Sequence, residues 1–228
     1  MPNWDKTQCL ERIKQQQTDY LAHYKLSQIY RKEKNNDKEL KRLLRVQKHN
    51  KQFNQRQVLL SIGEIFRKKK DFKNAVSYYI KVYKIRNDVD IKVKVGLCLE
   101  GKNKLKEAQK IYETVISKVP THWRALFRLG SLLIKQGQIR RGIDELQKAR
   151  SVNMKNIELN LELAKAYMLD KNDVSQNKRN VQLSRELLEE LIRNDKNNIT
   201  AKELLANIYE SMKKYKYAIH EIEGVVQR

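Results

Sequence analysis

Small residues recur along this 228-residue chain at a nearly constant spacing, and this spacing constrains the fold more than any other feature. Steps of 36, 33, 34, 34 and 42 residues separate Ser27, Gly63, Gly96, Gly130, Ala164 and Ala206. A period between 20 and 50 residues is typical of an array whose units pack only against their neighbours. The sequence therefore predicts one array of six units over residues 20–228, preceded by a segment 1–19.

The clearest unit lies between residues 122 and 156. It contains Leu129-Gly130 followed by Leu133, and then Gly142 followed by Leu146. The chain resembles the tetratricopeptide repeat family, in which W-x2-L-G-x2-Y, A-x3-F and P recur about every 34 residues as a helix–turn–helix. This resemblance implies an all-α fold, a right-handed α-solenoid of helix–turn–helix repeats.

Unit boundaries follow from the same register. The predicted units are 20–55, 56–88, 89–122, 123–156, 157–198 and 199–228. The long last step comes from the polar run KNDVSQNKR at 171–179, which we expect to be a loop insertion between the two helices of the fifth unit. It is either a plain surface extension or a contact loop. In the segment 1–19, Leu10 and Ile13 follow Asp5 at helical spacing, which fits a short leading helix or a frayed tail.

Positive charge is concentrated in the first four units. The chain carries a net charge of +22, and the successive units hold +7, +6, +3, +6, −1 and +1, while residues 1–19 are neutral. An A·T-rich coding genome also enriches Lys and Asn at exposed positions, and such drift is one explanation of the charge. Drift does not by itself explain the asymmetry.

Basic residues gather in the turns inside the units, which stacking should align into one ridge. The predicted ridge comprises Arg31, Lys32, Lys34, Arg67, Lys68, Lys69, Lys70, Lys102, Lys104, Lys106, Lys135, Arg140 and Arg141. Such a ridge suits an acidic partner, whereas any one of these turns alone is an ordinary solvated loop.

A second surface is implied by the family resemblance, whose members bind partners in a groove lined by the first helix of each unit. The groove positions carried over are Leu60, Val93, Leu97, Arg124, Phe127, Arg128, Ile134, Leu161 and Met168. They suit an apolar peptide or amphipathic helix, or else they pack between neighbouring first helices. Family members that clamp a chaperone's carboxylate tail use asparagines where this chain has Glu64 and Lys94, which argues against that role.

No pattern of catalytic, metal-binding or cofactor-binding residues is found. The four histidines have no Cys, Asp or Glu partner at metal-ligand spacing, and no phosphate-binding loop is present. Cys9 and Cys98 are expected to be reduced thiols. No apolar run is long enough to span a membrane, and residues 1–19 lack the features of a targeting signal. We therefore expect a soluble cytoplasmic protein that is not an enzyme.

The sequence leaves two functional hypotheses open. The first is a non-catalytic scaffold subunit that docks on an acidic protein such as tubulin, in a cytoskeletal or ciliary assembly. The second is an RNA-associated or ribonucleoprotein module that binds the phosphate backbone. Under either hypothesis, Ile219 and Val226 predict an apolar carboxyl-terminal face that another chain covers, because the ends of a repeat array normally need a polar outer face.

Overall fold

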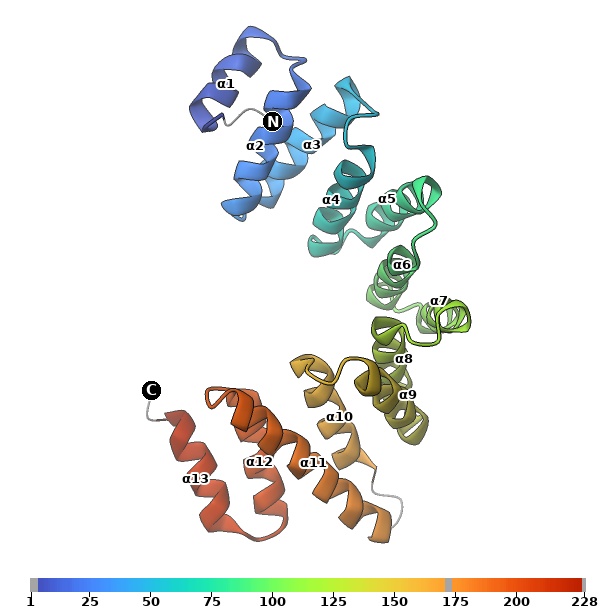
Figure 1. The fold of residues 1–228 in the computed structure, drawn as a ribbon, viewed down its shortest axis with the longest axis vertical. Helices are drawn as coiled ribbons and strands as arrows, with labels where there is room; N and C mark the ends of the chain where they lie inside the picture. Colours follow the sequence, from blue (N-terminus) through green and yellow to red (C-terminus); the bar gives the residue numbers. More distant parts are fainter. Residues whose placement is uncertain (1–3, 171–173, 227–228) are drawn as a thin grey trace. The chain divides into compact units, whose positions relative to one another are not determined.

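The structure, a computed structural model, describes the backbone of residues 4–170 and 174–226 and the side chains of 4–170 and 176–221. Within these residues the chain forms thirteen α-helices joined by short connections, and no β-strand (Figure 1). The helices are α1 (Lys6–Gln15), α2 (Tyr20–Lys32), α3 (Asn36–His49), α4 (Gln55–Lys68), α5 (Phe72–Ile85), α6 (Val89–Gly101), α7 (Leu105–Lys118), α8 (Trp123–Lys135), α9 (Ile139–Val152), α10 (Ile157–Leu169), α11 (Val174–Asn194), α12 (Ile199–Ser211) and α13 (Tyr215–Val226). Each expected unit from residue 20 onward contains two consecutive helices.

These helices form two compact units, Met1–Ile111 and Tyr112–Arg228, and the division falls inside α7. In the first unit α1 packs on α2, and the pairs α2/α3 and α4/α5 pack together. In the second unit the pairs are α8/α9, α10/α11 and α12/α13. This packing of consecutive helix pairs confirms the all-α repeat fold predicted from the sequence.

Short polar side chains begin most helices by accepting a hydrogen bond from a backbone amide of the first turn. The Asp19 carboxylate accepts from the amide of Ala22 at 2.9 Å at the start of α2. Before α8 the cap is His122, whose Nδ1 accepts from the amide of Ala125 at 3.2 Å. Local sequence therefore helps to set where most repeats begin.

In the first four repeats and in the sixth, the turn between the two helices reverses the chain through one residue with positive φ. Its members are Lys34 (φ 56°), Lys70 (60°), Asn103 (58°), Gly137 (79°) and Lys213 (57°). In each of these turns the backbone amide of the next residue donates a hydrogen bond to a carbonyl oxygen of the preceding helix, as Asn35 does to Tyr30 at 2.9 Å. This is the hydrogen bond that ends many α-helices at a left-handed residue.

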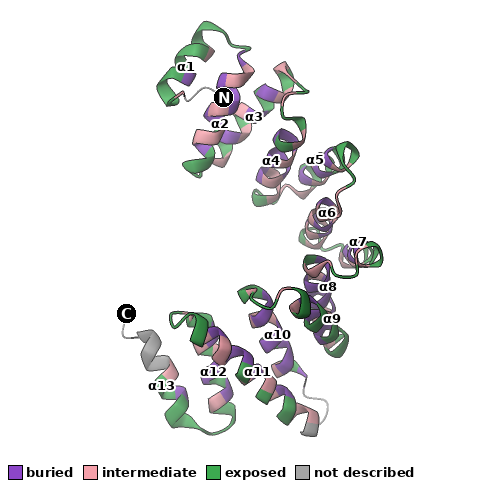
Figure 2. Cartoon of the chain, viewed as in Figure 1, coloured by how far each residue is buried: buried purple, intermediate pink, exposed green. Residues whose placement is uncertain are grey.

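In the first unit, buried residues lie where paired helices meet (Figure 2). Cys9 of α1 packs with Leu26 and Tyr30 of α2, so the leading helix contributes to the core. Gly63 is small because a Cβ there would lie 2.9 Å from the ring of Tyr79. The repeating small residue therefore marks the contact between the two helices of a pair.

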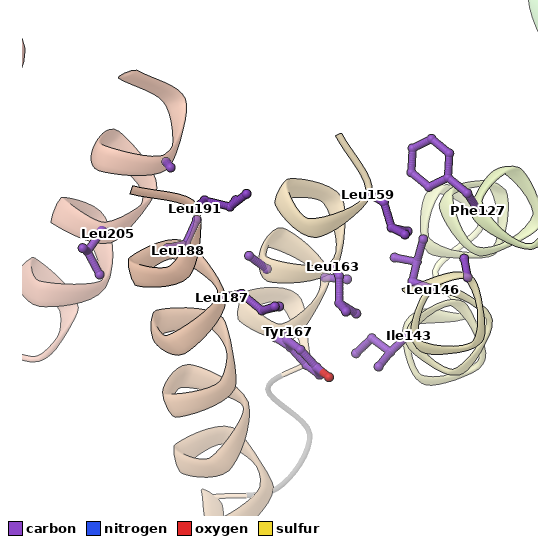
Figure 3. Packing of buried hydrophobic residues seen from close by; sticks show 14 of the residues in the cluster. Phe127, Ile143, Leu146, Leu159, Leu163, Tyr167, Leu187, Leu188, Leu191 and Leu205 are labelled. Carbon is purple, nitrogen blue, oxygen red and sulfur yellow. The ribbon is translucent and has the colours of Figure 1, made fainter. Parts of the chain in front are cut away.

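The second unit has a continuous apolar core, in which Leu146, Leu159, Leu163 and Leu188 come from three successive helices (Figure 3). The backbones of α8 and α9 approach most closely at two glycines. A Cβ added to Gly130 would lie 2.9 Å from the carbonyl oxygen of Gly142, and one added to Gly142 would lie 2.8 Å from the carbonyl oxygen of Gly130.

The predicted loop insertion at 171–179 is wrong over residues 174–179, because α11 begins at Val174 and runs for 21 residues. Residues 171–173 lie outside the described residues. Polar contacts hold this helical extension. Asn180, only 1% exposed, donates to the carboxylate of Asp170 at 3.1 Å, and Gln176 donates to Asn180 at 2.9 Å. The extra residues therefore lengthen a helix.

Candidate binding surfaces

Most side chains at the predicted groove positions are buried or partly buried within the protein. Val93 and Phe127 are 4% and 5% exposed, and Figure 3 places Phe127 at the edge of the second unit's core. Leu60, Ile134, Leu161 and Met168 are partly buried against the apolar clusters of their own units. Leu97 and Arg128 are half-buried, and Arg124 is exposed. Little apolar surface remains for a ligand at these positions.

Polar bridges also join the first helices of neighbouring repeats. Lys94 of α6 lies 2.6 Å from Glu64 of α4, and Arg67 lies 2.9 Å from the other carboxylate oxygen. Burial alone would raise the pKa of Glu64, but these two cations hold the pKa below its ordinary value. In the second unit Arg128 lies 3.5 Å from Glu158 of α10. Cations and anions at groove positions thus satisfy one another.

In the first unit the basic turns form a connected surface. Lys69, in the turn between α4 and α5, forms an ion pair with Asp37 at the start of α3. The ring of Phe72, at the start of α5, lies directly against Gly101, where α6 ends. The turn after α2 thus touches the turn after α4, which touches the turn after α6.

Each of these three turns presents two exposed lysines that have no ion-pair partner among the described residues. They are Lys32, Lys34, Lys68, Lys70, Lys102 and Lys106, and we call them the lysine ridge. Other predicted ridge residues are engaged: Arg31 bonds to Glu39 at 2.7 Å, Arg67 to Glu64, Lys69 to Asp37 and Lys104 to Glu107 at 2.7 Å. Of the ridge residues predicted in the first unit, these six are therefore the ones without an ion-pair partner among the described residues.

Two lysines of the ridge have a left-handed backbone conformation, which is energetically unfavourable for residues other than glycine. Lys34 and Lys70 have φ of 56° and 60°, where the equivalent residue of the fourth repeat is Gly137. A left-handed conformation costs a non-glycine residue roughly 1–2 kcal/mol. The sequence analysis missed this feature, although the alignment of Lys34 and Lys70 with Gly137 signals it.

The three predicted ridge residues of the second unit all have an interaction partner. Arg140 lies 3.5 Å from Asp170, and Arg141 donates to Gln138 at 2.5 Å. Lys135 is exposed but also interacts with a neighbour. Arg140 is therefore paired with an anion, whereas the partner of Arg141 is a neutral amide.

The carboxyl-terminal helix exposes apolar side chains. Ile219 is 54% exposed, and Tyr215 and Tyr217 are 58% and 59% exposed. The side chain of Val226, the second residue predicted for this face, lies outside the described residues. Tyr217 contacts the ring of Tyr209 on α12 at a centroid distance of 5.5 Å, which leaves its outer face free.

The described residues contain potential metal ligands and two cysteine thiols. Among the described residues no three His, Cys, Asp or Glu side chains could hold a metal ion together, and no helix combines the length and apolar character needed to cross a membrane. Cys9 and Cys98 are free and buried. Burial raises the pKa of Cys98 to about 11, so this thiol is protonated and unreactive at neutral pH.

Comparison with known families decides what the repeats are. Residues 57–89 and 124–152 each match a family model described as tetratricopeptide repeat. The chain is a tetratricopeptide repeat protein. No curated protein matches this tetratricopeptide repeat protein significantly. Proteins of this family generally act as non-catalytic scaffolds for protein interaction.

Solved structures share the fold of this tetratricopeptide repeat protein. A tetratricopeptide repeat protein from Parabacteroides merdae has 19% identity and a TM-score of 0.67, with 92% of this chain and 80% of that chain covered. PilF of Pseudomonas aeruginosa has 14% identity and a TM-score of 0.68 over 89% and 88%. A chain of the APC/C hetero-tetramer Cut9–Hcn1 has 12% identity and a TM-score of 0.70 over 96% of this chain and 42% of that chain.

Proposed function

We propose that this chain is a non-catalytic adaptor subunit whose first three repeats dock on an acidic protein surface through the lysine ridge. The observation that carries the proposal is the presence of six exposed lysines without ion-pair partners on three turns that touch one another. Exposed charges are screened over about 8 Å at physiological salt, so neighbouring turns act together on an approaching partner.

The placement of the ridge lysines favours a functional ridge over compositional drift. Drift would spread lysines over exposed positions, whereas six of them lie on three turns that touch one another. Lys34 and Lys70 of this ridge keep a charge where the fourth repeat has Gly137, and Lys213 of the sixth repeat has the same left-handed conformation. A partner's carboxylates would compensate the strain at the two turns.

Acidic protein tails such as those of tubulin have the chemistry that this ridge fits, which supports a place in a cytoskeletal or ciliary assembly. The attraction is electrostatic and rests on exposed charges, so it should be strong at low salt and fall as salt rises. Another subunit of the same assembly would cover the apolar surface formed by Tyr215, Tyr217 and Ile219.

A salt titration tests the proposal. The test variant replaces Lys32, Lys34, Lys68 and Lys70 by Gln, and the control replaces Lys48, Lys51, Lys73 and Lys84, which are also exposed and outside the ion pairs of the described residues. Binding to microtubules between about 0.05 and 0.2 M salt should weaken about tenfold in the test variant, with a flatter salt dependence, and change little in the control. Equal losses in both variants would contradict a localised ridge.

Removing the acidic tubulin tails should abolish the difference between the two variants. A polynucleotide partner would behave otherwise. Each lost phosphate contact would lower the slope of log affinity against log salt by about 0.7–0.9, and tail removal would be irrelevant. Binding to structured RNA but not to microtubules would therefore replace the acidic-protein proposal with the RNA-associated function.

A further inference from the structure

A basic cavity of about 380 Å³ lies between α1 and α3, above α2. Its polar lining includes Lys14 of α1, His23 of α2, and Lys41, Arg42 and Arg45 of α3. None of these residues belongs to the lysine ridge, so the cavity is a separate feature of the first unit. All of its lining residues lie within that unit.

His23 forms the floor of this cavity and is 2% exposed. Its Nε2 lies 3.0 Å from the carbonyl oxygen of Gln17, and a carbonyl can only accept, so Nε2 carries the proton. In the neutral ring Nδ1 is then an acceptor, and Arg42 Nη1 lies 3.4 Å from it. Burial lowers the pKa of His23, and nearby Arg42 adds to this effect, so the ring is neutral at physiological pH. A neutral ring therefore positions the guanidinium of Arg42.

The four cations of the cavity lack carboxylate partners among the described residues. Neither Lys14, Lys41, Arg42 nor Arg45 forms an ion pair there, and no Asp or Glu lines the cavity. The nearby acids have other partners. Asp19 binds Arg12 at 2.8 Å, and Glu39 binds Arg31 at 2.7 Å. Four like charges around one hollow repel one another unless an anion enters.

Other grooves of the chain have a different set of charged lining residues. Between α9 and α11, Arg150 lies 3.0 Å from Glu190, and both line the groove. Between α3 and α5, the groove is lined by Lys51, Lys81 and Lys84 without an Asp or Glu, but no arginine or histidine lines it. The cavity between α1 and α3 combines two guanidinium and two ammonium groups with a buried imidazole that orients one of them.

We propose that this cavity binds a phosphate monoester carried by a serine or threonine of a partner protein. A phosphorylated side chain brings a charge of about −1.5 to −2 and three strong acceptor oxygens, which match several cations better than one carboxylate does. Arginines recognise phosphate with two parallel hydrogen bonds, while lysines add point charge. Leu10, 41% exposed, and Ile13 offer apolar contact for the segment that carries the group.

The proposal adds a phosphorylation-dependent contact that is independent of the lysine ridge. A partner would dock through the ridge by its net acidity and through the cavity by one modified residue. Phosphorylation of the partner would then strengthen its binding to this chain without any change in the ridge.

Calorimetric titration of the full chain with a phosphoserine peptide, its unphosphorylated form and its glutamate form tests the proposal. We expect the phosphorylated peptide to bind at least about tenfold more tightly than either other peptide. Arg42→Gln with Arg45→Gln should remove that preference, as should Lys14→Gln with Lys41→Gln, whose exposed side chains lie outside the core. Lys68→Gln with Lys70→Gln removes the same charge from the ridge and should preserve the preference.

Other results would overturn the proposal. Equal affinity for the phosphorylated and unphosphorylated peptides would remove the phosphate site. A preference that survives both cavity variants would place the site elsewhere. Inorganic phosphate that binds as tightly as the peptide, or vesicles with phosphorylated inositol headgroups that outcompete it, would overturn the assignment of a protein-borne phosphate. These readouts do not depend on microtubule binding, so the proposal and the adaptor function can fail separately.

Discussion

Lys94 Nζ on α6 lies 2.6 Å from Glu64 Oε1 on α4, so one carboxylate links two neighbouring repeats. The side chains of Glu64 and Lys94 are 24% and 33% exposed, and Arg67 binds the second carboxylate oxygen. These are two of the positions at which chaperone-clamping relatives are expected to carry asparagine. Here the two residues satisfy one another, which stabilises the stack and removes a ligand-binding feature.

Glu64→Gln should therefore destabilise the first unit, since it leaves two partly buried cations without their anion. The cost should be about 1–2 kcal/mol, between the values for exposed and for buried pairs. Urea unfolding measures it. Glu107→Gln is the matched control, because it breaks the exposed Lys104–Glu107 pair and should cost under about 0.5 kcal/mol. Equal effects would contradict the bridge.

The ion pairs of Glu64 also make the stability of the first unit depend on pH in the acid range. The folded-state pKa of Glu64 lies below the ordinary 4.5, so its contribution is complete above that value and is lost as pH falls through the folded pKa. The Glu64→Gln variant should show a smaller loss of stability below about pH 4.5.

Gly130→Ala should destabilise the second unit by about 1–3 kcal/mol, because the new methyl group would lie 2.8 Å from Leu146 and 2.9 Å from the Gly142 carbonyl oxygen. Thermal unfolding gives the loss. Gly137→Ala separates backbone strain from crowding, since its Cβ meets no atom within 4 Å while its φ is 79°. That variant should lose only about 1 kcal/mol. A smaller loss of stability for Gly130→Ala than for Gly137→Ala would contradict the close contact between α8 and α9.

Lys70→Gly should raise stability while weakening partner binding. Glycine relieves the left-handed strain, and the net gain after its greater chain entropy should be about 0.5–1 kcal/mol. Lys68→Gly removes the same charge from a helical residue and should lower stability by about 0.5–1 kcal/mol. If Lys70→Gly stabilised the chain and left binding unchanged, the strain would have no link to the ridge.

Much of the fold could be predicted because its determinants are local and periodic. Gly130 and Gly142 stand where two helices touch, and their spacing within the repeat carries that information in the sequence. The residues 174–179 were predicted wrongly because this helical turn has no apolar periodicity. It is held by Asn180 and Asp170, a polar contact between residues ten apart.

The candidate surfaces were less predictable than the fold. The sequence shows where each basic residue is but not which acidic residue pairs with it. Arg31 and Lys32 therefore cannot be distinguished until the structure places Glu39 beside Arg31. The cavity was missed because Arg42 meets His23 only after α2 and α3 pair. Its one sequence signal is the set of Lys41, Arg42 and Arg45 on a helix face without acidic residues.

Ile219→Lys should reduce association through the carboxyl-terminal face without unfolding the chain, because Ile219 is 54% exposed on α13. Placing a charge on an apolar contact opposes its burial. Co-purification of the variant with its native assembly should fall, while its thermal stability stays within about 0.5 kcal/mol of the parent. Unchanged assembly would show that no subunit covers this residue.

Acidification should destabilise the first unit through His23. Its pKa in the folded protein is held below the ordinary 6.5 by burial, with Arg42, Arg45 and His49 of α3 facing the ring and Lys14 of α1 lining the same cavity. Above pH 6.5 neither state is protonated, so the full stability is present. As the pH falls below 6.5, His23 becomes protonated in the unfolded chain but stays neutral in the folded protein, so the free energy of unfolding decreases. This decrease ends once the pH has fallen below the folded-state pKa of His23.

His23→Gln removes this dependence and keeps the local hydrogen bonds, because a glutamine amide can donate to the Gln17 carbonyl and accept from Arg42. Urea unfolding of both proteins at about pH 7.5 and 5.5 measures the effect. We expect the parent to lose more stability than the variant over this interval. The same loss in the two proteins would mean that His23 takes up its proton in the folded state as readily as in the unfolded chain, and that Arg42 is not held by a neutral ring.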